Sequence, residues 1–331
     1  MHFISAACPK QSGKETDMTD KIRIPIFLAS DDNYLPYLAV TVKSIDDLSS
    51  DEYIYDVRIL GEGLNAHSLA LINSMPLRNT TVSVVNVTEH IGVMRGGLKL
   101  RLRDYYSESI FYRLFIADMF PEFQRVIYID CDVVLVSDIA ELYFTDMGDS
   151  IIAAVPDECI PSVPAFVEYV DRWVGVTADK YINSGVLVMN LAEFREAGIF
   201  DSFAEAVEGE NPDTVAPDQD YLNALCHGRI HYLGGEWNKQ PNEQNPIPVS
   251  QLKLIHYNMF KKPWHYTDVL YGEEFWRVAR TTPFADFISS ELASYTDEER
   301  RADEEGAARL VEHAARLAES GGSLLRRVVN V

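Results

Sequence analysis

Short apolar runs of strand length alternate with amphipathic segments of helix length from residue 22 onward. Runs rich in valine and isoleucine predict strands, and apolar residues spaced three and four apart predict helices. Their alternation is typical of an α/β sheet covered by helices on both faces, with its central strands buried. We expect strands at residues 26–29, 56–60, 81–87, 126–129, 151–155 and 185–190, and helices at 35–48, 66–75, 107–119, 220–226 and 273–280.

Composition divides the chain into three parts. Residues 1–21 are polar without periodicity, so we expect a disordered N-terminal extension. Residues 22–285 carry the alternating pattern and form the predicted α/β domain. Residues 286–331 form a helical appendage, because residues 296–320 place alanine, leucine and valine on one helical face. That helix could pack on its own domain, pair with a second copy as a homo-oligomer, or lie on a membrane, and its shallow alanine face favours the first two.

Charge and hydropathy exclude several classes of partner. The chain carries 29 basic and 51 acidic residues, a net charge of -22, which repels nucleic acid and anionic membranes. No run approaches the ~20 apolar residues of a membrane span, and a secretion signal is not recognisable. We therefore expect a cytoplasmic protein, with weak peripheral contact to the inner face of the membrane as an alternative. The four cysteines lack metal-site spacing and are expected to be reduced thiols.

A pair of aspartates follows one fully apolar strand. Residues 126–129 run directly into Asp130, Cys131 and Asp132. Ligands of open α/β sheets bind at the carboxyl ends of strands, so these carboxylates stand where a ligand is expected. Carboxylate oxygens suit Mg²⁺ or Mn²⁺, which commonly bridge carboxylates and diphosphate oxygens. The same residues also serve as turn formers and helix caps, so the pair alone leaves both interpretations open.

A second polar group closes the first predicted strand, where Ala29 and Ser30 precede Asp31, Asp32 and Asn33. Aspartate and asparagine accept hydrogen bonds from the unpaired amides of a helix start, so these residues could be caps. One carboxylate could cap while its neighbour faces the ligand crevice, because the first β-to-α turn borders that crevice.

Five ordered motifs resemble those of glycosyltransferase family 8, with the closest likeness to bacterial galactosyl- and glucosyltransferases of lipopolysaccharide and related surface glycans. The similarity covers about residues 22 to 280. It implies a GT-A, Rossmann-like fold with a mixed, mostly parallel sheet, and transfer of galactose or glucose from UDP-galactose or UDP-glucose with retention of configuration. The motifs are residues 27–34, 130–132, 183–187, 218–220 and 256–264.

The resemblance also implies metal and nucleotide contacts. Asp130, Asp132 and His256 match the ligands of Mn²⁺ or Mg²⁺, with Cys131 between the two aspartates among the donor contacts. A ligand histidine needs this motif context, because histidines at strand ends are more often structural. At the uridine, Asp31 would accept from the uracil N–H, Tyr34 would lie against the base and Asn33 would reach the ribose, with Ala29 beside them.

The remaining implied roles concern the sugar and the reaction. Asn183, Ser184 and Asp218 match residues that bind sugar hydroxyls, and Gln219 matches the residue nearest the anomeric carbon. Asp218 is the stronger nucleophile chemically, whereas a neutral amide is a poor one. We therefore expect attack by the acceptor on the face that the UDP leaves, with Gln219 stabilising the cationic centre. Arg113 and Lys262 match contacts to the sugar and diphosphate, although an arginine on a helix is usually solvated.

The chain departs from the family pattern at Met259, where the bacterial galactosyltransferases have glycine. Glycine permits close approach of the backbone to a ligand, so the diphosphate contact differs here. Residues 157–182 resemble a variable loop over the pocket that would select a glycan or glycolipid acceptor. The loop with Trp237 and Asn238 either shapes the sugar pocket or turns the chain. A self-glycosylating protein similar to glycogenin and a non-catalytic UDP-sugar binding protein stay open as alternative functions.

Overall fold

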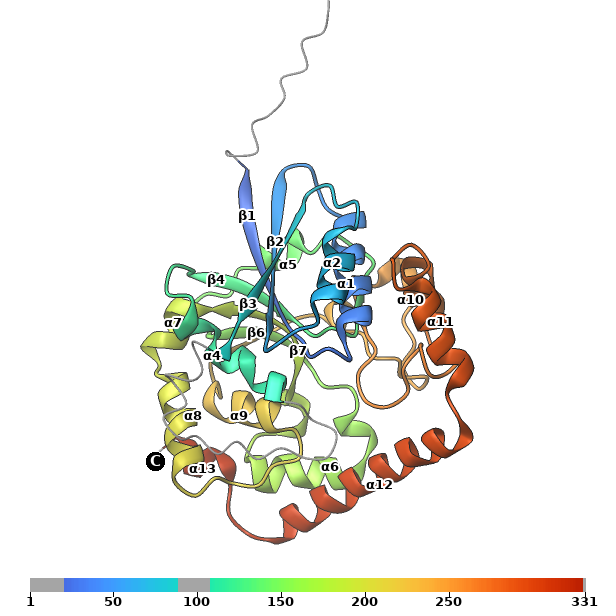
Figure 1. Cartoon of the computed structure of the whole chain (residues 1–331). Coiled ribbons are helices and arrows are strands. Elements are labelled where there is room, and N and C mark those ends of the chain that lie inside the picture. Colours follow the sequence, from blue (N-terminus) through green and yellow to red (C-terminus); the bar gives the residue numbers. More distant parts are fainter. Residues whose placement is uncertain (1–20, 89–107, 330–331) are drawn as a thin grey trace, which may run out of the picture.

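The computed structural model describes residues 21–88 and 108–329, and its centre is a seven-stranded sheet (Figure 1). The strand order is β3-β2-β1-β4-β7-β6-β8. Only β7 runs antiparallel to its neighbours, so the prediction of a mixed, mostly parallel sheet is confirmed. The strands are β1 (Ile22–Ala29), β2 (Tyr53–Gly61), β3 (Thr80–Asn86), β4 (Arg125–Ile129), β6 (Ile152–Pro156), β7 (Ile182–Asn190) and β8 (Ile230–Tyr232).

Alternating side chains of β1 show how the sheet is buried on both faces. Ile26 and Leu28 join a core with α1 (Leu35–Asp47) and α10 (Gly272–Ala279). Phe27 points the other way, into a core with α4 (Tyr112–Met119), α8 (Ile199–Glu208) and α9 (Pro217–Leu225). Because successive strand side chains face opposite sides, a continuous apolar strand requires helices on each face.

All six predicted strands and the five predicted helices are present, with shifted ends. The helix expected at 107–119 begins as a 3₁₀ turn, Glu108–Phe111, and continues as α4, while residue 107 lies outside the described residues. The other α-helices and strands of the predicted domain are α2 (Ala66–Asn73), β5 (Val133–Leu135), α5 (Ala140–Tyr143), α7 (Leu191–Glu196), β9 (Leu254–His256) and α11 (Ala285–Ser294). The pattern missed β5, β8, β9 and α5, because three or four residues carry too little periodicity to be recognised. It also missed the longer α7, α8 and α11.

The prediction of a variable loop at residues 157–182 is wrong. The segment contains α6 (Pro164–Tyr169), which continues as a π-helical turn over Val170–Val174. Tyr169 and Trp173 are buried in a third apolar cluster. The segment is therefore a packed wall of the domain, stabilised by its aromatic side chains, and its prolines start helical turns rather than prevent them.

The predicted helix at 296–320 is α12 (Asp297–Glu319), which begins with a capping box between Thr296 and Glu299. Leu310, Ala314 and Leu317 pack against the aromatic residues of α6, alongside which α12 runs in Figure 1. The short α13 (Leu324–Val328) follows and buries Leu324 and Val328 in the core with α8 and α9. The appendage thus packs on its own domain, one of the two arrangements that the sequence favoured. None of the helices in residues 21–88 and 108–329 is long and apolar enough to cross a bilayer.

The predicted extension at residues 1–21 lies outside the described residues except for Lys21, so it stays a prediction. The boundary at residue 285 also stays a prediction.

Packing of α12 predicts a clear difference between its two faces. Leu317 is buried, so Leu317→Ala should lower the free energy of unfolding by about 2–4 kcal/mol through lost contacts and a cavity. The exposed Glu312 on the same helix provides the matched control, and Glu312→Ala should change stability by less than about 0.5 kcal/mol. Denaturant unfolding followed by circular dichroism measures both. Equal effects of the two substitutions would show that α12 does not depend on this contact.

Candidate functional site

Four strands meet at one edge of the main sheet. The parallel strands β1, β4 and β6 end there, and the antiparallel β7 begins there, since Ile129 of β4 pairs with Val186 of β7. A cavity of about 350 Å³ opens at this edge. Of the predicted site residues, all but Asn33 line it: Ala29, Asp31, Tyr34, Arg113, Asp130, Cys131, Asp132, Asn183, Ser184, Asp218, Gln219, His256 and Lys262.

A separate two-stranded sheet brings His256 to the aspartates. β5 follows Asp132 directly and pairs antiparallel with β9, which places Val133 opposite His256. The amide of Tyr257 also donates to the carbonyl of Asp132 at 2.9 Å. The buried apolar residues of β5 and β9 stabilise this pairing. The backbone therefore fixes the imidazole beside a motif more than a hundred positions earlier in the chain.

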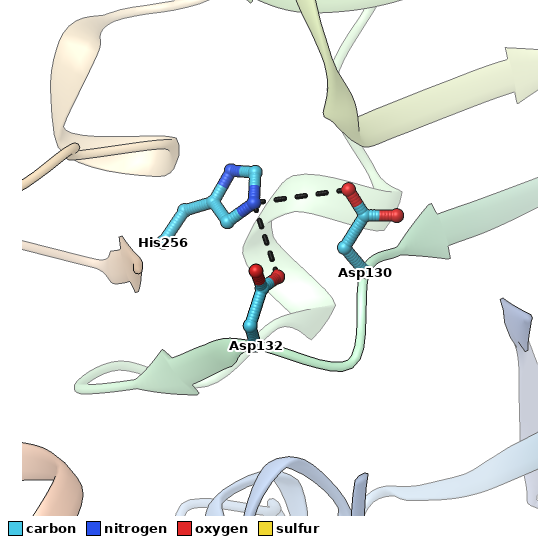
Figure 2. A group of neighbouring side chains, drawn as sticks. All are labelled: Asp130, Asp132 and His256. Carbon is cyan, nitrogen blue, oxygen red and sulfur yellow. Dashed lines mark ion pairs between the residues drawn. The ribbon is translucent and has the colours of Figure 1, made fainter. Parts of the chain in front are cut away.

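The three side chains form a compact donor set, drawn in Figure 2. One ligand atom from each of Asp130, Asp132 and His256 lies within 4.8 Å of the other two. His256 Nε2 is 3.1 Å from Asp132 Oδ1 and 3.7 Å from Asp130 Oδ2. Asp132 Oδ1 is buried and has no hydrogen-bond partner among the described residues. An unsatisfied carboxylate oxygen beside an imidazole and a second carboxylate fits a divalent cation such as Mn²⁺.

Gly185 makes room for this cluster. A Cβ atom built at residue 185 would lie 2.2 Å from His256 Cε1 and 2.6 Å from Asp130 Oδ2. Both distances are far below van der Waals contact, so the close approach of β7 to the cluster needs glycine. The carbonyl of Gly185 meanwhile accepts from the amide of Asp130 at 2.8 Å, which fixes the start of the aspartate motif.

Arg113 lies in the interior of the site, unlike most helix arginines. Its guanidinium is buried over the ring of Tyr128, with Cζ 4.3 Å from the ring centroid. Nη2 donates to Asp130 Oδ1 at 2.9 Å, and Nε lies 3.1 Å from Asp218 Oδ2. Because each buried carboxylate needs a compensating charge, one arginine holds the end of β4 and the start of α9 together.

Lys262 supplies the second cation. Its Nζ lies 2.5 Å from Asp132 Oδ2 and donates to the carbonyl of Tyr257 at 2.6 Å. Burial alone would raise the pKa of Asp132, but the ammonium of Lys262 opposes that effect, and the pKa lies well below its usual value. Burial likewise opposes the charge of Lys262, but Asp132 raises its pKa above the ordinary value. Both groups are therefore charged at neutral pH.

Ser184 connects the two residues of the predicted catalytic pair. Its hydroxyl donates to Asp218 Oδ2 at 2.8 Å, and its amide donates to Gln219 Oε1 at 3.0 Å. Burial raises the pKa of Asp218, while Arg113 opposes the increase. Proline at the start of α9 fits the first helical turn, and the two side chains project from that turn towards the cavity.

The turn after β1 combines both interpretations left open by the sequence. Asp31 Oδ1 accepts from the amides of Asn33 and Tyr34 at 3.0 and 3.2 Å, so this aspartate caps the turn while also lining the cavity. Asn33 is exposed and lies outside the cavity lining. The thiol of Cys131 donates to the carbonyl of Ala29 at 3.0 Å, and burial raises its pKa, so it stays protonated.

Sequence reasoning missed several lining residues. Asp157 follows the apolar strand β6 as Asp130 follows β4, so the same strand-end signal could have identified it. Phe260 and Leu310 carry no such signal, because neither directly follows a strand. Leu310 belongs to α12, which reaches the cavity only through tertiary packing, including the contact of Gly306 with Phe260. Trp237 and Asn238 are buried next to a 3₁₀ turn, Gly235–Trp237, and neither lines the cavity, which favours the interpretation that their loop turns the chain.

Met259 keeps the backbone conformation that glycine would favour. Its φ is 60°, in the left-handed region that costs a residue with a side chain about 1 kcal/mol or more. Its side chain lines the cavity beside Phe260. Met259 therefore adds a side chain to the wall of the pocket between His256 and Lys262.

Comparison with known proteins identifies the family. The model of the family described as glycosyl transferase family 8 matches residues 25–268. The chain belongs to glycosyltransferase family 8. General stress protein A of Bacillus subtilis is 24% identical over 264 residues, which cover 72% of this chain and 87% of that protein. The lipopolysaccharide 1,2-glucosyltransferase of Escherichia coli is 24% identical over 209 residues, which cover 59% of this chain and 61% of that enzyme.

Solved structures agree with the family and with the fold. The galactosyltransferase LgtC, crystallised with donor and acceptor sugar analogues, is 26% identical to this chain, with a TM-score of 0.61. The similarity covers 85% of this chain and all of LgtC. The prediction of a GT-A fold is confirmed, and this family 8 chain is a glycosyltransferase by membership.

Substitution of Gly185 tests whether the cluster works as a cation site. Gly185→Ala should displace His256 and Asp130 and weaken Mn²⁺ binding by about tenfold or more, because ligand orientation governs metal affinity. Gly272→Ala is the matched control, since a Cβ there meets its nearest atoms at 3.6 and 3.9 Å. Titration calorimetry with Mn²⁺ and saturating UDP measures the affinity. Undiminished affinity in a folded Gly185→Ala protein would contradict the site.

Proposed function

We propose that this chain is a retaining hexosyltransferase that moves galactose or glucose from a UDP-sugar to a glycan or glycolipid acceptor with the help of Mn²⁺ or Mg²⁺. The observation that carries the proposal is the meeting of Asp130, Asp132 and His256 within one cavity. The names of two similar proteins, a galactosyltransferase and a lipopolysaccharide glucosyltransferase, support a hexose donor and a saccharide acceptor.

The cavity has the chemical parts that a nucleotide diphosphate requires. A cation held by Asp130, Asp132 and His256 would neutralise negative charge on the departing diphosphate. Lys262 is placed to add a second positive charge on the same side, and its raised pKa keeps it protonated. Its present partner is Asp132, so a diphosphate would exchange one anionic contact of Lys262 for another.

Uridine fits the end of β1. Asp31 lines the cavity there, and Tyr34 lies edge-on to Tyr37 and Trp264, with ring centroids 5.7 and 6.4 Å away. Aromatic faces stack readily on bases, and a carboxylate accepts from a ring N–H. Asn33 would have to turn inward to reach a ribose, because its side chain is exposed in this structure.

Contacts within the catalytic pair support attack from the face on which UDP leaves. Asp218 Oδ2 is held by Arg113 and by the Ser184 hydroxyl, which makes this carboxylate a less available nucleophile. Gln219 carries no charge, and its amide oxygen accepts from Ser184. We assign Asp218 to sugar binding and Gln219 to stabilisation of the positively charged anomeric centre.

One wall of the cavity is apolar and suits the acceptor. Met259, Phe260 and Leu310 lie there, whereas the metal-binding and sugar-binding residues provide polar atoms. The carbon-rich faces of pyranose rings pack on such side chains, while their hydroxyls need polar partners. Leu310 belongs to α12, so the C-terminal appendage takes part in acceptor selection in this proposal.

Removing one carboxylate tests the metal and donor assignment. Asp132→Ala should abolish Mn²⁺-dependent UDP binding, because it leaves two of three protein ligands and also frees Lys262. Asp179→Ala changes an exposed aspartate outside the cavity lining and should bind like the wild type. Calorimetry with UDP, with and without Mn²⁺, measures this. A wild-type protein that neither binds UDP nor hydrolyses UDP-galactose or UDP-glucose with Mn²⁺ would contradict the proposed function.

Truncation of Gln219 tests the reacting centre. Gln219→Ala should keep UDP affinity within about threefold but slow hexose transfer by about 100-fold, the order of effect of losing one electrostatic contact in a transition state. The measurements are UDP calorimetry and transfer kinetics with the better of the two donors. Transfer at the wild-type rate would remove Gln219 from the mechanism.

A further inference from the structure

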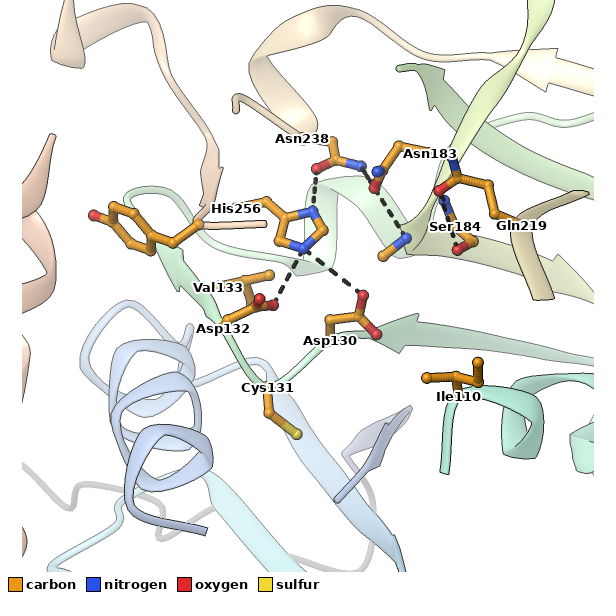
Figure 3. A network of polar contacts seen from close by, with 12 residues as sticks. Ile110, Asp130, Cys131, Asp132, Val133, Asn183, Ser184, Gln219, Asn238 and His256 are labelled. Atoms are coloured by element: carbon orange, nitrogen blue, oxygen red, sulfur yellow. Dashed lines mark hydrogen bonds and ion pairs between the residues drawn. The ribbon is translucent and has the colours of Figure 1, made fainter. Parts of the chain in front are cut away.

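A continuous series of hydrogen-bonded side chains connects the metal histidine with the catalytic glutamine, and Figure 3 shows its first part, from His256 through Asn238 to Asn183. His256 Nδ1 lies 2.9 Å from Asn238 Oδ1, and Asn238 Nδ2 donates to Asn183 Oδ1 at 2.9 Å. Asn183 Nδ2 donates to Asp157 Oδ2 at 2.9 Å, and Gln219 Nε2 donates to the same oxygen at 3.2 Å. All five side chains are buried. Four of the five line the cavity, and Asn238 lies outside its lining.

The backbone amide of Gly185 and the carboxylate of Asp157 fix the direction of each hydrogen bond in this series. The amide of Gly185 donates to Asn183 Oδ1 at 3.0 Å, so that atom is an acceptor and its neighbour Asn238 Nδ2 is the donor. Asn238 Oδ1 must then face His256, and only a protonated Nδ1 can donate to it. The proton on Nδ1 leaves the lone pair of neutral His256 on Nε2, directed at the two aspartates.

Resting on the proposed function, we infer that Asn238 is a positioning residue. It holds His256 in the tautomer that can bind a cation and, through Asn183 and Asp157, sets the orientation of the Gln219 amide. At the far end, Asp157 accepts from Gln219 Nε2, which turns Gln219 Oε1 towards the amide of Ser184. One asparagine from a loop thus orients both the metal ligand and the residue at the reacting centre.

Backbone contacts hold Asn238 in place independently of the side-chain hydrogen bonds between His256 and Gln219. Lys239 forms an isolated bridge with Ile255, and its carbonyl accepts from the amide of His256 at 2.9 Å. The buried Lys239 ammonium also pairs with Glu158, the neighbour of Asp157, at 2.5 Å. The loop that carries Asn238 is therefore joined to His256 at one end of the hydrogen-bonded series and to the segment of Asp157 near the other end. These contacts allow Asn238 to act as a rigid support.

The first test removes the amide. Asn238→Ala should weaken Mn²⁺ binding by about 10- to 100-fold, the usual effect of losing the partner of a ligand histidine. Asn79→Ala is the matched control, because Asn79 is also buried and hydrogen-bonded, to Asp51 at 2.8 Å, but lies outside the cavity lining. Electron paramagnetic resonance of free Mn²⁺ in the presence of saturating UDP measures affinity without turnover. Wild-type affinity in folded Asn238→Ala would overturn the inference.

The isosteric substitution Asn238→Asp tests the effect on His256 separately from the effect on Gln219. It also covers the case in which Asn238→Ala fails to fold. In Asn238→Asp the carboxylate still accepts from Nδ1, so Mn²⁺ affinity should stay within about threefold of the wild type or increase. The other carboxylate oxygen takes the place of the donor Asn238 Nδ2 and faces Asn183 Oδ1, which is also an acceptor. The hydrogen bond between residues 238 and 183 is therefore lost, and with it the connection towards Gln219. Transfer should therefore slow by about tenfold or more at saturating Mn²⁺. Loss of Mn²⁺ affinity, or transfer at the wild-type rate, would contradict the assignment.

The wild-type protein distinguishes failure of this inference from failure of the proposed function. Absence of UDP-dependent Mn²⁺ binding by the wild type would refute the metal site itself and the inference with it. Binding by the wild type together with equal binding by Asn238→Ala would refute the positioning residue alone. A fall in affinity for Asn238→Ala but not for Asn79→Ala supports the inference.

Discussion

An excess of negative charge governs this cavity. Five aspartates line it, at positions 31, 130, 132, 157 and 218, and the cations among the described lining residues are Arg113 and Lys262. Uncompensated buried carboxylates are strongly destabilising, so each of the two cations is shared between acidic or carbonyl partners. A diphosphate would increase the excess, which is why a divalent cation at Asp130, Asp132 and His256 is a physical requirement of the proposed function.

Strand pairing decides where that charge collects. β4 ends in the aspartate motif, and β5 continues directly into a second, two-stranded sheet with β9. The chain between Asp130 and Asp132 thus leaves one sheet and enters another, so the aspartates stand at the junction and His256 arrives from the other strand. Gly185 then approaches from β7, where a side chain would collide with the cluster. The geometry of the site is therefore a property of the backbone before any ligand binds.

Sequence reasoning found what lies at strand ends and missed what depends on distant packing. The aspartates at 130 and 132 were predictable because an apolar strand marks its own carboxyl end, and Asp157 carries the same signal after β6. His256 needed the family motif, since nothing local connects it with β4. Asn238 was named only as part of a loop, because its contact with His256 arises from the bridge between Lys239 and Ile255. The apolar neighbours Tyr112, Leu114 and Phe115 indicated an inward-facing Arg113, but nothing in the sequence indicated the two carboxylates that it faces.

The helix α12 shows that the pocket is lined by more than the part of the chain that matches the family model. The family match ends at residue 268, yet Leu310 of α12 lines the cavity. Gly306 lies so close to Phe260 that a Cβ would be 2.9 Å from the ring atom Cε1, so the position of the helix and that of the Phe260 ring depend on each other. Phe260 follows Met259, whose left-handed backbone directs a side chain into the same wall. The polar lining thus comes from residues within the family match, while the apolar wall combines Met259 and Phe260 with a helix beyond that match.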